Sequence, residues 1–330
     1  MHPTLHTTST VHRPFSHPQL ILAPMAGITE PVFRMLCKKH GADIVVTEMV
    51  SVEALYRQAK PALKLMDITP GERPVGIQLF GADPKKFAWC AAYIDEHIGP
   101  DFIDLNCGCP APKIVKKNGG SALLKDEKLY ARIIESMVQA TSVPVTVKIR
   151  SGWEMHTWVD VAYAKIAQEC GAAAITVHPR SKTMGFSGHS FRERIGEVKN
   201  AVSIPVVGNG DVRTPRDALD MFEQTGCDSI MIGRGTYGNP WLFDSIKKAL
   251  KGEQATAVSR KEKIDTAREH LNAYCRVHGE HRASREMKKH ISWYIKGIPQ
   301  ASQLRNDIFR SQSVRELQEL LHSDILNDRS

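Results

Sequence analysis

The stretch LILAPMAG (20–27) decides the fold of this chain. Its first half, LILA (20–23), is a short continuous apolar run, and PMAG (24–27) follows directly. A doubly wound dinucleotide-binding sheet would carry a G-x-G-x-x-G turn after its first strand, because these glycines let the backbone approach a pyrophosphate. The sequence has no such turn at this place, which favours the other common architecture of parallel strands, a closed barrel.

Seven further apolar runs follow at intervals filled by helical patterns. They are DIVV (43–46), VGIQL (75–79), FIDL (102–105), VTVKI (145–149), AITV (174–177), PVVG (205–208) and SIMIG (229–233). Runs of this composition are typical of strands buried on both faces of a parallel sheet. Helices are expected over 84–97, 125–141, 158–170, 214–224 and 240–250. Eight such units over 19–251 predict an α/β fold, the (β/α)8 or TIM barrel.

The two ends of the chain differ from this pattern. Residues 1–18 are rich in Thr, His and Pro, and we expect them to form a flexible leader. After residue 251 the strand-like runs stop, and apolar residues recur at helical spacing over 261–278, 285–295 and 313–321. We therefore expect a small C-terminal helical domain over 252–330, in which basic residues outnumber acidic ones.

Composition narrows the class of protein. The chain has 330 residues, of which 42% are hydrophobic and 24% charged, so it can bury a large core. No run approaches the ~18 consecutive apolar residues of a membrane span, and no secretory signal pattern is present. Seven cysteines without framework spacing are typical of a cytoplasmic protein. The net charge of +8 favours a polyanionic partner.

Glycine-rich turns follow the last two predicted strands. GNGD (208–211) comes after the seventh and GRG (233–235) after the eighth. In barrels of this class, backbone N–H groups at these two loops commonly bind a phosphate, to which Arg234 can add a bidentate contact. We interpret them as a site for the phosphate of a substrate or cofactor, rather than as tight turns only.

Three polar side chains lie on or just after other strands. Lys148 ends a buried strand, where a charged lysine indicates an anionic or electron-accepting group above it. Gln78 offers both a donor and an acceptor, which suits a ring with imide edges, although a structural amide is an equal alternative. His178 follows the sixth strand and shares the expected rim with Lys148 and Arg234, which favours ligand binding.

Cys107 and Cys109 follow the fourth strand. A C-x-C pair is half a zinc site, and the remaining cysteines offer no second pair, so a structural metal is disfavoured. A cysteine in this loop, with an unperturbed pKa near ~8.5, is mostly protonated at neutral pH and can act as a general acid. These considerations leave the choice between Cys107 and Cys109 open.

The stretch IDLNCGCPAPKIVKKNGGS (103–121) resembles the signature of the tRNA-dihydrouridine synthases, flavoenzymes of the (β/α)8 fold. Further similar segments are APMAGIT (23–29), TEM (47–49), VKIR (147–150), VHPR (177–180), GNGD (208–211) and IGRG (232–235). KKHISWY (288–294) is similar to the bacterial B-type branch of that family. The resemblance covers roughly residues 20–310.

This resemblance implies an FMN-dependent reduction of tRNA uridines to 5,6-dihydrouridine, with NADPH as reductant and Cys109 as the proton donor to C5 of uracil. The residues that it assigns to FMN are Pro24, Met25, Ala26, Gln78, Lys148, His178, Asn209, Gly210, Asp211, Gly233 and Arg234. Cys107 occupies a variable position of the family signature. Lys182 replaces the family's second arginine, which keeps the charge but loses the planar set of donors.

The expected RNA contacts combine the rim of the barrel with the helical domain. They are Arg180 and Lys182 on the rim, and Arg285, Lys288 and Lys289 in the helical domain. We expect the protein to act as a cytoplasmic monomer with neither a structural metal nor a membrane segment.

Three other functions fit parts of the sequence. One is an FMN barrel of the dihydroorotate dehydrogenase type, but a free pyrimidine would need no basic helical appendage. The others are a sugar-phosphate isomerase without flavin and an RNA-binding protein with an inactive barrel. The sequence leaves open which tRNA position is modified and whether NADPH or NADH is preferred.

Overall fold

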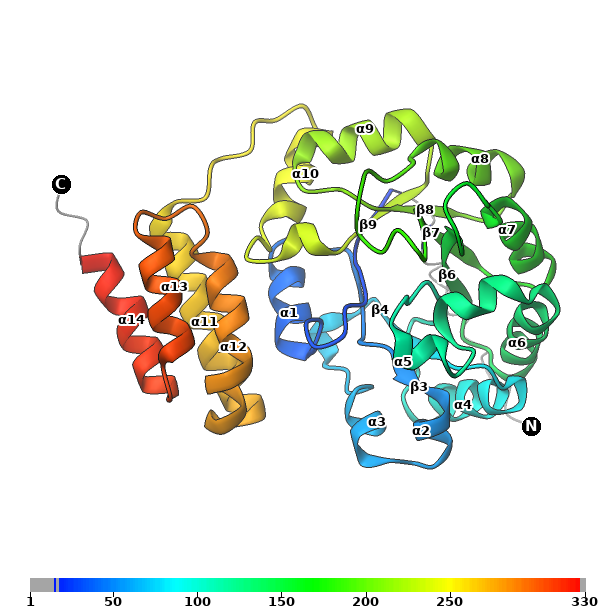
Figure 1. Cartoon of the computed structure of the whole chain (residues 1–330), viewed down its shortest axis with the longest axis horizontal. Helices are drawn as coiled ribbons and strands as arrows, with labels where there is room; N and C mark the ends of the chain where they lie inside the picture. The colour runs from blue at the N-terminus through cyan, green and yellow to red at the C-terminus, as the bar shows by residue number, and fades with distance from the viewer. Residues whose placement is uncertain (1–14, 16–17, 327–330) are drawn as a thin grey trace, which may run out of the picture.

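The computed structural model describes residue 15 and residues 18–326 (Figure 1). Eight parallel strands close into a barrel in the order β1-β2-β4-β5-β6-β7-β8-β9, with β9 paired back to β1. They are β1 (Leu20–Leu22), β2 (Ile44–Val46), β4 (Val75–Phe80), β5 (Phe102–Cys107), β6 (Val145–Gly152), β7 (Ala174–Ser181), β8 (Val206–Asn209) and β9 (Ser229–Ile232). The predicted barrel is confirmed. A two-residue strand, β3 (Val50–Ser51), also pairs with β4, beyond the end of β2.

Helices surround the barrel in the expected alternation. The longer ones are α1 (Pro31–Lys39), α4 (Pro84–His97), α6 (Glu127–Ala140), α7 (Asp160–Glu169), α8 (Glu193–Ala201), α9 (Pro215–Thr225) and α10 (Leu242–Leu250). Short helical segments lie in the loops: α2 (Val52–Tyr56), α3 (Lys60–Lys64), α5 (Pro112–Val115), η1 (Pro70–Glu72), η2 (Gly120–Lys125) and η3 (Arg234–Thr236).

Local signals in the sequence set the ends of these helices, as α9 illustrates. The side chain of Thr214 accepts the backbone N–H of Asp217 and the Asp217 carboxylate accepts that of Thr214, which satisfies donors that the first turn leaves unpaired. Gly226 ends the helix in the left-handed region at φ +63°, which other residues adopt at a cost. The chain thereby enters β9 three residues later.

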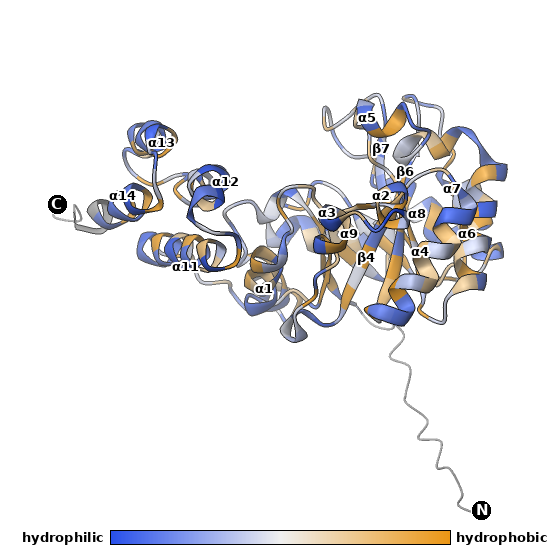
Figure 2. Ribbon diagram, turned by 90° about the horizontal axis from the view of Figure 1, so that it is seen from below, coloured by the Kyte–Doolittle hydropathy of each residue, from blue (hydrophilic) through white to orange (hydrophobic). Residues whose placement is uncertain are grey.

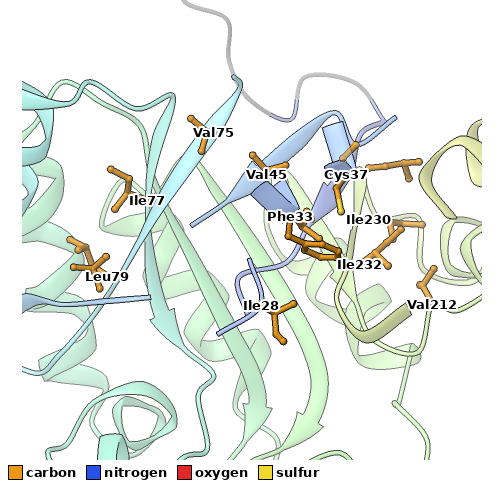
Figure 3. Close-up of a cluster of buried hydrophobic side chains, with 14 of the residues drawn as sticks. Ile28, Phe33, Cys37, Val45, Val75, Ile77, Leu79, Val212, Ile230 and Ile232 are labelled. Carbon is orange, nitrogen blue, oxygen red and sulfur yellow. The ribbon is translucent and has the colours of Figure 1, made fainter. Parts of the chain in front are cut away.

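Side chains alternate between two faces of each strand. Val75, Ile77 and Leu79 of β4 point outward into the layer between strands and helices, and Phe33 of α1 lies in the same layer against Val45 (Figure 3). The alternate positions point into the barrel. This alternation, which follows from the two-residue period of a strand, separates an apolar outer core from the barrel interior.

Aromatic rings close the barrel interior at the amino-terminal ends of the strands. Phe15 is buried and packs edge-on against Phe102, the first residue of β5, with 5.5 Å between ring centroids. Gly76 makes room for Phe102, because a Cβ at residue 76 would lie 2.2 Å from that ring. The expectation of a flexible leader over 1–18 is therefore wrong at Phe15, while residues 1–14 and 16–17 lie outside the described part.

Four helices follow the barrel: α11 (Arg260–His278), α12 (Glu280–Tyr294), α13 (Ala301–Arg310) and α14 (Val314–Leu326). They lie together on the side of α1, and hydrophilic and hydrophobic residues alternate around each (Figures 1 and 2). His278 lies 3.0 Å from the Glu30 carboxylate, and the rings of Phe33 and His270 stack at 5.6 Å, so α11 is joined to the start of α1. The expectations from the sequence did not include α13. Within residues 18–326 no helix is long and apolar enough to cross a membrane.

Candidate active site

A cavity of about 520 Å³ lies at the carboxyl ends of the barrel strands, within the range typical of small-molecule sites. The structure brings to its lining every residue for which cofactor binding was predicted, together with the candidate acid Cys109. These residues are Pro24, Met25, Ala26, Gln78, Lys148, His178, Asn209, Gly210, Asp211, Gly233 and Arg234. They come from six different strands or the loops that follow them, so the barrel closure is what assembles them.

A chain of hydrogen bonds forms the polar layer below the cavity. Gln78 donates to Asp104 at 2.7 Å and accepts from the side chain of Asn106 at 2.7 Å, while Thr146 donates to the other oxygen of Asp104 at 2.6 Å. Burial raises the pKa of Asp104, although the bonds from Gln78 and Thr146 oppose the shift. The amide of Gln78 is thus held with a fixed orientation at the cavity floor.

Asn106 also fixes the loop that carries Cys109. Its side-chain oxygen accepts the backbone N–H groups of Gly108 at 3.1 Å and Cys109 at 2.9 Å. The carbonyl of Cys109 accepts both the backbone N–H and the hydroxyl of Ser121. The thiol is therefore presented to the cavity by a loop that is bonded on both sides.

The two cysteines of this loop have different environments. Cys107 is fully buried in the outer core, where burial raises the pKa of its thiol well above the ordinary value. Cys109 is half-buried and lines the cavity; burial raises its pKa too, while the N–H of Ala111 and the charge of Arg150 oppose this. Cys109 thus carries its proton at neutral pH and faces the cavity, as a general acid must.

Lys148 points into the cavity from β6 and donates a 2.8 Å hydrogen bond to the side-chain oxygen of Asn209. Burial and the nearby Arg150 lower the pKa of Lys148 to about 8, and Asp104 opposes them. The amide of Asn209 donates in turn to the carbonyl of Met231 at 2.8 Å, which fixes its orientation. The ammonium therefore meets a neutral oxygen, and much of its charge remains available to an anion.

Cationic side chains gather around His178, three of which, Lys148, Arg150 and Arg234, line the cavity with it. Burial, and then the charges of Lys148, Arg150, Arg180 and Arg234, lower its pKa well below the ordinary value, so the ring is neutral. Asp211 is the carboxylate in the lining, and it lies 2.6 Å from Arg180 and 3.6 Å from Arg234, so the cationic side chains outnumber the carboxylate there. This excess of positive charge fits a phosphorylated, anionic cofactor such as FMN.

The prediction that Arg180 contacts RNA is wrong. Its side chain is 1% exposed and donates to the carbonyls of Ser187 and Gly188 and, at 2.6 Å, to the carboxylate of Asp211. β7 extends to Ser181, so Arg180 lies inside a strand and points into the barrel. Burial raises the pKa of Asp211, but the hydrogen bond and charge of Arg180 and the hydrogen bonds from Ser190 together outweigh it, and the pKa is lowered. Arg180 therefore orders the loop beneath Asp211.

Lys182 does lie on the rim. Its ammonium is 4.6 Å from the ring centroid of Trp153, and that of Lys125 is 3.5 Å from the same ring. Trp153 follows β6, which stands across the barrel from β1 and β9. Two cations are thus held on one indole at the far side of the cavity mouth from the C-terminal helices.

The basic residues of α12 have three different environments. Arg285 is exposed. Lys288 is half-buried and donates to the carbonyls of Phe309 and Ser311, at the end of α13, so it caps a helix and we withdraw it as an RNA contact. Lys289 donates to the carbonyl of Gly27, in the loop after β1, at 2.5 Å, so this contact holds its ammonium against the barrel.

Reasoning from sequence gave no role to four residues of the site. Asp104 and Asn106 lie within the quoted signature, where two polar residues in a buried strand were the available signal. Arg150 donates to the carbonyls of Gly108, Ser181 and Gly185, which ties two loops together. Phe186 is 55% exposed at the mouth, with the guanidinium of Arg234 4.3 Å from its ring; nothing in its local sequence distinguished it. The described residues contain no cluster of three side chains that could hold a metal ion.

The chain is similar in sequence to known proteins. Residues 21–329 match the sequence profile of a family described as dihydrouridine synthase (Dus). The chain is 41% identical over 303 residues to tRNA-dihydrouridine synthase B of Pseudomonas aeruginosa, covering 91% of this chain and 90% of that one. It is 39% identical over 297 residues to the protein of the same name from Xanthomonas axonopodis pv. citri, covering 90% and 89%.

A solved structure, histamine dehydrogenase from Rhizobium sp. 4-9, superposes with a TM-score of 0.54 at 14% identity. The match covers 70% of this chain and 46% of that one, so this chain spans less than half of that structure's length. At this identity the likeness concerns the barrel fold alone.

Proposed function

The chain belongs to the dihydrouridine synthase family, and we propose that it reduces uridines of tRNA to 5,6-dihydrouridine, with FMN in the barrel and NADPH as reductant. The observation that carries the proposal is the cationic cavity, whose lining combines the protonated thiol of Cys109, the fixed carboxamide of Gln78 and the ammonium of Lys148. The signature over residues 103–121 implied the same function.

The residues of the cavity divide into two groups by what they would hold. Gly210, Gly233 and Arg234 follow β8 and β9, where a barrel commonly receives a phosphate. Gln78, Lys148 and Asn209 lie at the centre, where they would meet a ring with imide edges. When bound, FMN supplies the hydride that reduces C6 of uracil, and it accepts its electrons from NADPH.

The chain's own contributions are orientation and one proton. Cys109 donates the proton of its Sγ to C5 of uracil, from the face that the Asn106 loop presents to the cavity. Lys148 stabilises negative charge on the reduced cofactor, because its ammonium is held beneath the cavity mouth.

A uridine of folded tRNA reaches the cavity only after it has left its stack. The surfaces suited to the flanking phosphates are Lys182 and Lys125 on Trp153, on one side, and exposed Arg285 of α12 on the other. We assign residues 19–251 to an FMN-binding catalytic domain and 252–330 to a helical tRNA-binding domain, in a protein that works as a cytoplasmic monomer.

The test begins with the purified protein. We expect a yellow protein with flavin absorbance whose NADPH oxidation is stimulated by tRNA lacking dihydrouridine, and not by free uracil or orotate. Mapping of dihydrouridine in tRNA from cells without the protein identifies the modified position. A flavin-loaded protein that consumes NADPH with a free pyrimidine but ignores tRNA would overturn the proposal.

A further inference from the structure

One face of α12 contacts the two barrel loops that border one side of the cavity. Lys289 donates to the carbonyl of Gly27 in the loop after β1, at 2.5 Å. The ring of Trp293 stacks on that of Tyr237 in the loop after β9, with 4.2 Å between centroids and 9° between planes. Since Lys289 and Trp293 are four residues apart on α12, they lie on the same face of the helix.

The loop after β1 is held from two directions at Gly27. Its N–H donates to the carboxylate of Glu48, in the loop after β2, at 2.5 Å, and its carbonyl accepts from Lys289 of α12. Gly27 has φ +72° and follows Ala26, which lines the cavity with Met25. Met25 is bonded within the loop to Ile28 and Thr29, and the contact with α12 fixes the loop at the residue that follows Ala26.

The loop after β9 is held even more closely. Tyr237 lines the cavity, and its N–H donates to the carbonyl of Arg234 at 3.2 Å, which closes the turn that carries that guanidinium. The next residue, Gly238, has φ +63°, and a Cβ there would lie 2.3 Å from the carbonyl carbon of Trp293. The backbone of this loop thus packs directly on the backbone of α12.

Attachment of the C-terminal helices does not depend on these contacts alone. Glu30, which caps the start of α1, already contacts His278 of α11, and Phe33 of α1 stacks on His270, both away from the cavity. Residues of β1 and β9 pair with each other, so their loops are neighbours and a single helix reaches both. The contacts of Lys289 and Trp293 therefore lie at the loops that line the cavity.

We propose that Lys289 and Trp293 are positioning residues of the cofactor site, through which the C-terminal helices set the FMN affinity of the barrel. The inference rests on the proposed function, because it takes FMN as the ligand. Neither side chain lines the cavity; each acts through a loop residue, Gly27 or Tyr237. The helical part of the chain is then a component of the flavin site as well as a surface for RNA.

The experiment is a fluorescence titration of flavin-free, full-length protein with FMN. We expect Trp293→Leu to raise the Kd for FMN about three- to tenfold, the range that corresponds to a lost aromatic pair. Lys289→Met is expected to raise it about threefold, since a half-exposed charged hydrogen bond contributes less than a buried one. Trp293→Phe and Lys289→Arg keep the stack and the donor, and are expected to restore Kd to near the wild-type value.

Lys296→Met is the matched control, because Lys296 is exposed just beyond the end of α12. A role in attachment alone predicts a lower melting temperature with an unchanged Kd for FMN in both Trp293→Leu and Lys289→Met, and that result overturns the inference. If Trp293→Leu does not fold, the comparison of Lys289→Met with Lys289→Arg tests the inference, because Lys289 is only half-buried. Wild-type protein that fails to bind FMN overturns the proposed function and this inference together, whereas equal Kd values overturn the inference alone.

Discussion

The side-chain oxygen of Asn106 accepts the backbone N–H of Cys109 at 2.9 Å, so the strand that ends at Cys107 also orients the thiol of the following loop. Cys109→Ala should leave FMN binding and flavin reduction by NADPH intact but lower tRNA turnover about 10²- to 10⁴-fold, the usual contribution of a general acid. Single-turnover kinetics with pre-reduced enzyme measures this step. Cys107→Ala is the control, and its turnover should stay within a few-fold of wild type. Exchanged phenotypes would place the acid at Cys107.

Lys148→Met removes the ammonium at the cavity floor. Because that charge is expected to interact with the cofactor, the Kd for FMN should rise about ten- to a hundredfold, as for a lost charge-assisted hydrogen bond, and the flavin should become harder to reduce. Titration with FMN and redox potentiometry measure both quantities. Lys165→Met, at an exposed residue of α7, should change neither the Kd for FMN nor the flavin potential. An unaltered flavin potential in Lys148→Met would refute the role given to this lysine.

The same substitution should stabilise the flavin-free protein. The pKa of Lys148 is lowered from 10.5 to about 8 in the folded state. Between these pH values the unfolded chain binds more protons than the folded one, so stability rises with pH across this window, and below it the buried charge is unfavourable. We expect Lys148→Met to raise the free energy of unfolding at pH 7 by about 1–3 kcal/mol, and the gain to shrink as pH rises above 8. Urea denaturation at several pH values tests this.

Glu30 links the barrel to α11. Burial raises its pKa, but the imidazoles of His270 and His278 and the N–H of Val32 outweigh this and hold the pKa at about 2, against an ordinary 4.5. The stability that this carboxylate contributes is therefore present above pH 4.5 and is lost as pH falls toward 2. Glu30→Gln should cost about 2–3 kcal/mol at pH 7 and much less near pH 3. Glu280→Gln, exposed on α12, should show neither effect.

Arg285 and Lys288 lie on the same helix, but substitutions of them should affect different properties: tRNA binding for Arg285 and stability for Lys288. Arg285→Gln removes an exposed charge, so the salt dependence of tRNA binding should flatten by roughly 0.7–0.9 per lost phosphate contact, with normal melting temperature. Lys182→Gln is expected to act similarly. Lys288→Met removes the cap on α13 and should lower the free energy of unfolding by about 1–2 kcal/mol, with little change in the salt slope. A reduced slope in Lys288→Met would restore it as an RNA contact.

The barrel could be predicted because each strand buries its outward side chains among helices, which leaves long apolar runs in the sequence. The positions of the side chains at the carboxyl ends of the same strands are harder to predict from the sequence. Arg180 resembled a rim residue because β7 continues four residues beyond the run AITV (174–177), so a buried ion pair was taken for a surface charge.

The role of Lys288 depends on α13, a helix for which the sequence gives only a weak signal. Only Leu304 and Ile308 of α13 are buried, too few apolar positions for a clear helical period. The carbonyls that Lys288 caps could therefore not be predicted, and this lysine, which lies beside other basic residues, was interpreted as part of an RNA surface. Contacts of this kind depend on tertiary packing and leave no local signal.

Phe15 and Phe102 close the barrel from below, and this closure constrains the order of events during turnover. With FMN in the barrel as proposed, a nicotinamide and an extruded uracil would both approach it from the carboxyl ends of the strands. On that proposal the two ligands would bind in alternation, and the bound cofactor would carry the two electrons from the first to the second. Initial-rate measurements with varied NADPH and tRNA should accordingly give parallel double-reciprocal lines, the pattern of a ping-pong reaction.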